Sequence, residues 1–330
     1  MNLFLKNLKN ILLATTRGIS KFFAKSHPRI LMYHRVLPDE HTDSMPLDTF
    51  KEQVRLLKRD FNVISLQRMT QASHIPNNSV VLTFDDGYYD FYYHIYPVLK
   101  KYQIPATLFV TTSFIDGEIW FWPDKIRYLL KHCHKDDIYI EECNKKFNLR
   151  KEAFSCWDEI SSYCLTLSNE SRSKFFDKLE VLTKIKIPES VPEEYRALTW
   201  GQLEEISGSG LIEVASHTIS HQILSKLSIP EMEKEIWLSK KLIEKRLNNS
   251  VYSFCYPNGM KGDFNQLIKK VVSDAGYKYA LTAYPSFDPL RDMMEINRYP
   301  ASSDISSFKN SLYGLRYYSF IRDFLKRKLF

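Results

Sequence analysis

The sequence predicts an α/β protein built on a parallel sheet or barrel that helices cover. Short runs rich in β-branched and aromatic residues alternate with stretches of helical periodicity, and several of these runs are apolar on both faces. Strands of a parallel sheet are buried on both faces and therefore lose the alternation of polar and apolar residues. The expected strands span residues 29–34, 62–66, 79–84, 106–111, 211–217, 251–257, 277–283 and 295–300.

Residues 1–28 are expected to form a basic amphipathic segment. Leu5, Leu8 and Ile11 recur at helical spacing, and lysines interrupt the apolar stretch before it could span a bilayer or act as a cleavable signal. The C-terminal segment, 301–330, repeats the theme with aromatic residues beside Arg and Lys. Two interpretations stay open for both ends: packing on the domain with solvated basic faces, or peripheral contact with an anionic membrane surface.

Between these ends we expect one α/β domain over residues 29–300, interrupted at about 119–196 by an insertion. The insertion is rich in Lys, Glu, Ser and Cys, and stretches such as "PDKIRYLLKHC" at 123–133 have helical spacing of their apolar residues. We therefore expect helices joined by polar connections in this part of the chain.

Charge and cysteine usage exclude several classes of protein. The formal net charge is +7, with much of the excess at the two ends, but Lys and Arg are otherwise spread widely and form no long run, which argues against a nucleic-acid partner. The five cysteines are an odd set without a CxxC pair, which argues against a disulfide framework and a structural zinc knot. A reducing compartment fits this pattern best.

Polar residues finish two of the expected strands. Asp85 and Asp86 follow the run 79–84, and two adjacent carboxylates repel each other and desolvate badly, so a purely structural role is hard to find. His217 and His221 close the run 211–217, and two histidines four apart on a helix or helical turn can reach one divalent ion. In a barrel both strand ends lie at the same rim. One acid would then bind the metal and the other would accept a proton.

Three motifs, in order, give the chain its resemblance to a known family. They are "TFDDG" at 83–87, "SHTISH" at 216–221 and "FCYPNG" at 254–259. With them the chain resembles the polysaccharide deacetylase family, also called the NodB-homology or carbohydrate esterase 4 family, over roughly residues 29–300. The resemblance implies a distorted (β/α) barrel and the metal-dependent removal of an acyl group from an amino sugar.

The resemblance also implies roles for individual residues. Asp85 would be the general base, and the backbone N–H of Asn258 would hold the oxyanion. The metal ligands would be Asp86, His217 and His221. Zinc suits two imidazoles and one carboxylate, and Co, Ni or Mn would fit the same ligands.

The chain departs from the family pattern at two places. Cys255 stands where the family often has an Arg that orients the catalytic Asp, and Arg298 or Arg35 could supply that charge instead. The family's late His, which protonates the leaving amine, is also missing, because no histidine occurs after His221. His34, which closes the first expected strand, is the candidate replacement.

These observations favour a metal-dependent hydrolase that removes an N-acetyl or N-formyl group from an amino sugar of a bacterial cell-surface polysaccharide or its lipid-linked precursor. Two alternatives stay open: a carbohydrate-binding scaffold of the same fold that has lost catalysis, and a metal amidohydrolase with a non-sugar substrate. We expect a cytoplasmic protein, peripheral on the inner membrane; the alternative is an uncleaved anchor that faces the periplasm or the cell exterior.

Overall fold

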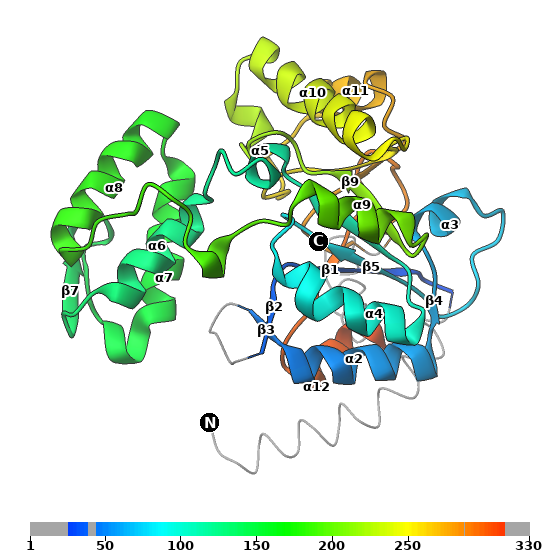
Figure 1. Cartoon of the computed structure of the whole chain (residues 1–330), viewed down its shortest axis with the longest axis horizontal. Coiled ribbons are helices and arrows are strands. Elements are labelled where there is room, and N and C mark those ends of the chain that lie inside the picture. Colours follow the sequence, from blue (N-terminus) through cyan, green and yellow to red (C-terminus); the bar gives the residue numbers. More distant parts are fainter. Residues whose placement is uncertain (1–25, 39–43, 287, 314–330) are drawn as a thin grey trace, which may run out of the picture. The chain divides into compact units, whose positions relative to one another are not determined.

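A computed structural model describes residues 26–38, 44–286 and 288–313. The chain divides into two compact units (Figure 1): Met1–Ile115 with Leu198–Phe330, and Asp116–Ala197. Each unit has its own apolar core. The candidate site residues all belong to the first unit, so its sheet is the part of the fold that matters for function.

The first unit is built on a parallel sheet with strand order β11-β10-β9-β6-β5-β1-β12, and β4 pairs with β5 beside this path. All pairings in this sheet are parallel among the described residues. The α/β fold class with a parallel sheet is therefore confirmed. The strands are β1 (Arg29–Tyr33), β4 (Asn62–Val63), β5 (Ser79–Phe84), β6 (Ala106–Val110), β9 (Ile212–Ser216), β10 (Ser253–Cys255), β11 (Tyr279–Leu281) and β12 (Tyr299–Pro300).

The sheet curls into a distorted barrel because one late segment contacts both of its ends. Ile296 forms a parallel bridge with Leu281 of β11, and Tyr299 pairs with Leu31 of β1 only three residues later. Side chains from successive strands meet inside the curl. Buried members of this cluster come from β1, β5, β6, β9, β10 and β11: Ile30, Val81, Phe109, Ala215, Cys255 and Leu281.

Helices cover the sheet, and local sequence signals start several of them. Thr199 caps α9 (Trp200–Gly208) and Ser228 caps α10 (Ile229–Leu247), each in a capping box with the residue three positions on. Both helices pack against β9 (Figure 1). The remaining helices of this unit are α2 (Leu47–Asp60), α3 (Leu66–Gln71), η1 (Phe91–Ile95), α4 (Tyr96–Tyr102), α5 (Thr112–Ile115), η4 (Leu224–Lys226), α11 (Gln266–Asp274) and α12 (Ile305–Leu312). A short parallel pair, β2 (Val36–Leu37) with β3 (Met45–Pro46), lies outside the main sheet.

The second unit contains the expected helices and a hairpin that the sequence analysis missed. Its helices are α6 (Trp122–His132), α7 (Leu149–Thr166) and α8 (Asn169–Thr183), with short turns η2 (Glu141–Cys143) and η3 (Glu193–Tyr195). Strands β7 (Asp137–Ile140) and β8 (Lys145–Asn148) pair antiparallel. Ile138 and Ile140 are buried between exposed neighbours, an alternation too short to stand out beside the helical stretches.

Within the described ranges, no helix is long and apolar enough to cross a bilayer. The amphipathic character expected of residues 1–28 and 301–330 falls largely on 1–25 and 314–330, which lie outside the described residues. Membrane contact through the ends therefore stays a prediction. All five cysteines are free.

Candidate metal centre and active site

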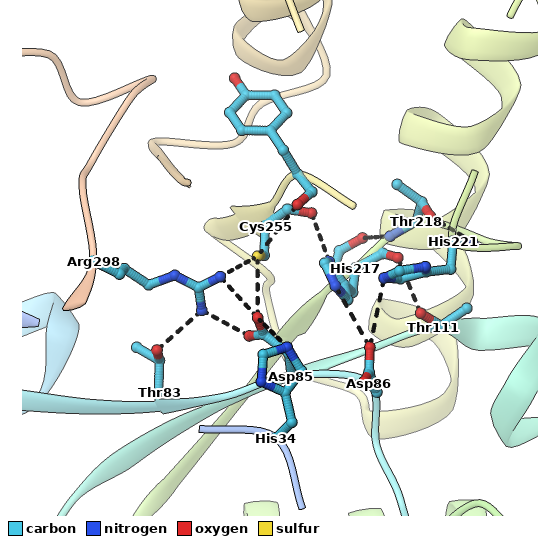
Figure 2. A network of polar contacts seen from close by, with 12 residues as sticks. His34, Thr83, Asp85, Asp86, Thr111, His217, Thr218, His221, Cys255 and Arg298 are labelled. Atoms are coloured by element: carbon cyan, nitrogen blue, oxygen red, sulfur yellow. Dashed lines mark hydrogen bonds and ion pairs between the residues drawn. The ribbon is translucent and has the colours of Figure 1, made fainter. Parts of the chain in front are cut away.

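The carboxyl ends of neighbouring strands bring the predicted residues together at one edge of the sheet (Figure 2). His34 follows β1, the two aspartates follow β5, and the first histidine follows β9. Cys255 ends β10, and Arg298 directly precedes β12. Residues more than 200 positions apart in the sequence therefore meet in one cluster.

Asp86, His217 and His221 form a group that can hold one metal ion. The Asp86 Oδ1 atom lies 3.7 Å from His217 Nε2 and 3.6 Å from His221 Nε2 (Figure 2). Both distances are too long for a good hydrogen bond. They suit atoms around a shared ion, because metal–ligand distances of about 2.1 Å place tetrahedral ligands roughly 3.4 Å apart. The donor set therefore fits a divalent cation, while its identity stays a prediction.

Both imidazoles are available as neutral ligands. The Nδ1 atom of His217 is hydrogen-bonded to the carbonyl oxygen of Cys255 at 2.8 Å, which leaves Nε2 to face Asp86. Burial lowers the pKa of His217 to about 3 and that of His221 to about 4, because a charged imidazolium is poorly solvated there. At neutral pH both rings therefore offer a lone pair.

The two histidines lie on an irregular loop, so the expected helix or helical turn is wrong. Thr218 and His221 have φ values of +69° and +56°, a left-handed conformation that costs roughly 1–2 kcal/mol for a side chain with a Cβ. Hydrogen bonds hold this loop in place: His221 N donates to Thr218 Oγ1 at 3.0 Å, and Thr111 Oγ1 donates to the His217 carbonyl at 3.1 Å. Asp86 is also left-handed, with φ +78°. Backbone strain is therefore concentrated at the candidate ligands, as it often is at functional sites.

Asp85 lies beside this group but is bound by Arg298. The guanidinium donates from Nη1 to Oδ1 and from Nη2 to Oδ2, both at 2.7 Å, and both side chains are buried. Burial alone would raise the pKa of Asp85, but the charge and hydrogen bonds of Arg298 outweigh it and hold the pKa well below its ordinary value. Arg298 therefore holds Asp85 ionised and fixed in orientation. Arg35, the other candidate, pairs instead with Asp90 at 3.1 Å.

A second group of potential ligands, Asp85, His217 and Cys255, is a poorer metal site. Metals bind the thiolate, and burial raises the pKa of Cys255 well above its ordinary value, so the thiol stays protonated. Arg298 Nη2 also donates to Cys255 Sγ at 3.0 Å, and its positive charge would repel a cation there. The group that contains Asp86 is therefore the better candidate for a metal site.

Asn258 follows β10 three residues after Cys255, and His34 lies beside Asp85. Asn258 has φ +57°, and its side-chain Nδ2 donates to Asp263 at 2.6 Å. Its backbone N–H has no hydrogen-bond acceptor in the described part of the chain. Gly259 packs so tightly that a Cβ would lie 2.9 Å from the Ala283 nitrogen. His34 Nε2 lies 3.8 Å from Asp85 Oδ2, and its side chain is 49% exposed.

One residue that contacts this site was missed from sequence. Glu235 on α10 is buried, and its carboxylate accepts hydrogen bonds from the loop that carries His221. The signal was present but weak: Glu235 interrupts the buried stripe of α10, between Met232 and Ile236. An acid in the apolar stripe of a helix needs a partner, although the sequence does not say which.

Comparison with known proteins identifies the class to which this fold and site belong. The model of the polysaccharide deacetylase family matches residues 73–142 and 167–280, more than half of the chain. The chain belongs to this family. The family is one of hydrolases that act on carbon–nitrogen bonds in carbohydrates.

Individual relatives are distant. The poly-beta-1,6-N-acetyl-D-glucosamine N-deacetylase of Escherichia coli K12 is 25% identical over 185 residues, which are 54% of this chain and 18% of that protein. The enzyme of the same name from Staphylococcus aureus MSSA476 is 32% identical over 101 residues, 29% of this chain and 35% of that protein. The Bacillus subtilis protein YxkH is 23% identical over 261 residues, 78% of this chain and 64% of that one. The chain thus spans less than two thirds of each of these relatives.

Solved structures agree on the fold. IcaB from Ammonifex degensii matches with a TM-score of 0.57 at 18% identity, covering 87% of this chain and 97% of that one. The Streptococcus pyogenes deacetylase PplD, solved in complex with acetate, matches with a TM-score of 0.56 at 19% identity, covering 85% and 95%. The distorted (β/α) barrel expected from the motifs is confirmed.

Proposed function

We propose that this protein removes an N-acetyl or N-formyl group from an amino sugar of a bacterial cell-surface polysaccharide or of its lipid-linked precursor. One observation carries the proposal. Asp85 is buried beside the candidate ligand group yet is bound by Arg298, so it is available as a base rather than as a ligand. Relatives named as N-acetylglucosamine deacetylases support the choice of an N-acylated sugar.

In this proposal the chain's own residues divide the work of amide hydrolysis. A divalent cation bound by Asp86, His217 and His221 would polarise the amide carbonyl and lower the pKa of a bound water toward ~7. Asp85 accepts a proton from the attacking water, and the backbone N–H of Asn258 donates to the carbonyl oxygen as negative charge develops on it.

The carbon–nitrogen bond then breaks, and the amine needs a proton to leave. His34 is the proposed donor, because it lies next to Asp85 and keeps access to solvent. Arg298 orients Asp85 in place of the Arg that the third motif lacks. The products are the free amino sugar and a carboxylate.

Two alternatives remain: a scaffold that has lost catalysis, and an amidohydrolase with a non-sugar substrate. A scaffold would have no use for a second buried aspartate with its own arginine partner. The test is to load the protein with zinc and incubate it with N-acetylglucosamine oligomers or with lipid-linked amino sugars, and to measure free amine. Release from one sugar class supports the proposal, and metal binding without release from either contradicts it.

We further propose that the protein works on the cytoplasmic face of the inner membrane, where a lipid carrier would present its substrate. The basic, apolar-rich ends of the sequence support this location. Flotation with vesicles that contain anionic lipid, with and without residues 1–25, tests it. Equal recovery of both forms in the soluble fraction would contradict it.

A further inference from the structure

Glu235 on α10 is a buried acid that the proposed chemistry does not use. Its side chain is 8% exposed, and it lies one helical turn from Met232 and Ser239 on the buried face of α10. In the described part of the chain all of its hydrogen-bond donors come from the loop between the two histidines. The carboxylate is therefore satisfied by this loop.

Three donors converge on this carboxylate. Ile219 N and Ser220 N donate to Oε2 at 2.8 and 2.9 Å, and Ser220 Oγ donates to Oε1 at 2.5 Å. Hydrogen bonds to a carboxylate are roughly twice as strong as those between neutral groups. Glu235 thus clamps the two residues that immediately precede His221.

The clamp acts on a segment that would not keep this shape unaided. Thr218 and His221 flank the clamped residues, and both are left-handed. On the opposite side, Thr112 N donates to the Thr218 carbonyl and Ser113 N donates to the Ile219 carbonyl. The loop is held between α5 and α10, and Glu235 supplies the contact from α10.

We propose that Glu235 is a positioning residue that holds His221 in the geometry for metal binding. The inference rests on the proposed metal centre and adds the element that preorganises it. The backbone of His221 is fixed through Ser220, so loss of the clamp lets the His221 ring leave the position where its Nε2 faces Asp86. Residues that orient metal ligands in this way typically change metal affinity 10- to 100-fold when removed.

The test compares Glu235→Ala with Glu231→Ala. Glu231 lies on the same helix one turn earlier, is exposed, and accepts hydrogen bonds only from Ser228 within the described residues. Its replacement weakens the cap of α10 without touching the loop, so it controls for loss of helix stability. Zinc dissociation constants are measured by competition with a chelator, and the visible spectrum of the cobalt form reports ligand geometry.

We expect Glu235→Ala to raise the zinc dissociation constant about 10- to 100-fold and to alter the cobalt spectrum. Glu231→Ala should leave both close to wild type. Glu235→Gln keeps one carbonyl acceptor without the charge and should give a smaller rise, and it serves if the Ala variant fails to fold. Equal dissociation constants for the Glu235 and Glu231 variants would overturn the proposal.

Hydrogen exchange of the metal-free proteins separates this inference from the proposed function. Glu235→Ala should speed amide exchange at residues 218–221, and Glu231→Ala should not. If the wild type binds no zinc, the proposed function fails, whereas the exchange comparison still decides whether Glu235 orders the loop. Unchanged exchange at 218–221 in Glu235→Ala would contradict the clamp itself.

Discussion

The buried pair of Asp85 and Arg298 yields a sharp prediction for stability. Arg298→Met keeps an apolar chain of similar length but leaves Asp85 buried without its two 2.7 Å hydrogen bonds. Removing one partner of a buried ion pair costs about 3–5 kcal/mol, because the remaining charge is uncompensated. Asp85→Asn should destabilise for the same reason, since it leaves the guanidinium unpaired.

The double variant, Asp85→Asn with Arg298→Met, removes both charges. Its loss of unfolding free energy should be smaller than the sum of the single losses, by about 0.5–3 kcal/mol, as expected for residues in direct contact. The assay is urea unfolding of the four metal-free proteins, followed by circular dichroism. Additive losses within error would refute the claim that these two side chains form one stabilising unit.

The pair also sets a dependence on pH. The folded-state pKa of Asp85 lies below its ordinary value, because Arg298 outweighs the effect of burial. Such a group contributes stability that is complete above its unfolded pKa of about 3.9 and is lost as pH falls further. Arg298→Met removes the main influence that opposes burial, so the pKa of Asp85 should rise and the activity profile should move to higher pH. An unchanged profile would contradict this reasoning.

Two other substitutions test the site. Gly87→Ala should cost about 2 kcal/mol or more of unfolding free energy, because φ is +93° and a Cβ would lie 2.9 Å from Ile115 Cδ1. The matched control is Gly208→Ala, whose Cβ would have no heavy atom within 4 Å. Urea unfolding measures both variants, and equal losses of unfolding free energy would contradict the prediction. His34→Ala should lower kcat on an N-acetyl sugar about 10²-fold or more while zinc content is unchanged. The loss should be much smaller on an activated aryl ester, whose leaving group needs no proton, and the same loss on both substrates would exclude His34 as the acid.

The strands could be predicted from sequence because they depend on local pattern, and the proximity of the two motifs that carry the candidate ligands follows from the strands. Buried parallel strands show as apolar runs, and the topology then places their carboxyl ends together. The aspartate pair could be grouped with His217 and His221 for this reason, and the resemblance to the family then selected Asp86 as the acid that joins the two histidines.

Contacts set by distant parts of the chain could not be predicted. Sequence analysis favoured Arg298 as the partner of Asp85 but left Arg35 open, since the choice depends on how a segment 213 residues away closes the barrel. The loop that ends at His221 was expected to be helical because its spacing permits one turn. Its actual shape depends on Glu235 and on hydroxyl contacts that only the packed helix and strands provide.

The division of labour between the two adjacent aspartates is the central claim, and one paired measurement tests it. Zinc content and turnover are determined for Asp85→Asn and Asp86→Asn side by side. We predict that Asp85→Asn keeps its ion and loses activity, whereas Asp86→Asn loses both. Retention of zinc in both variants, or its loss from Asp85→Asn alone, would contradict the account.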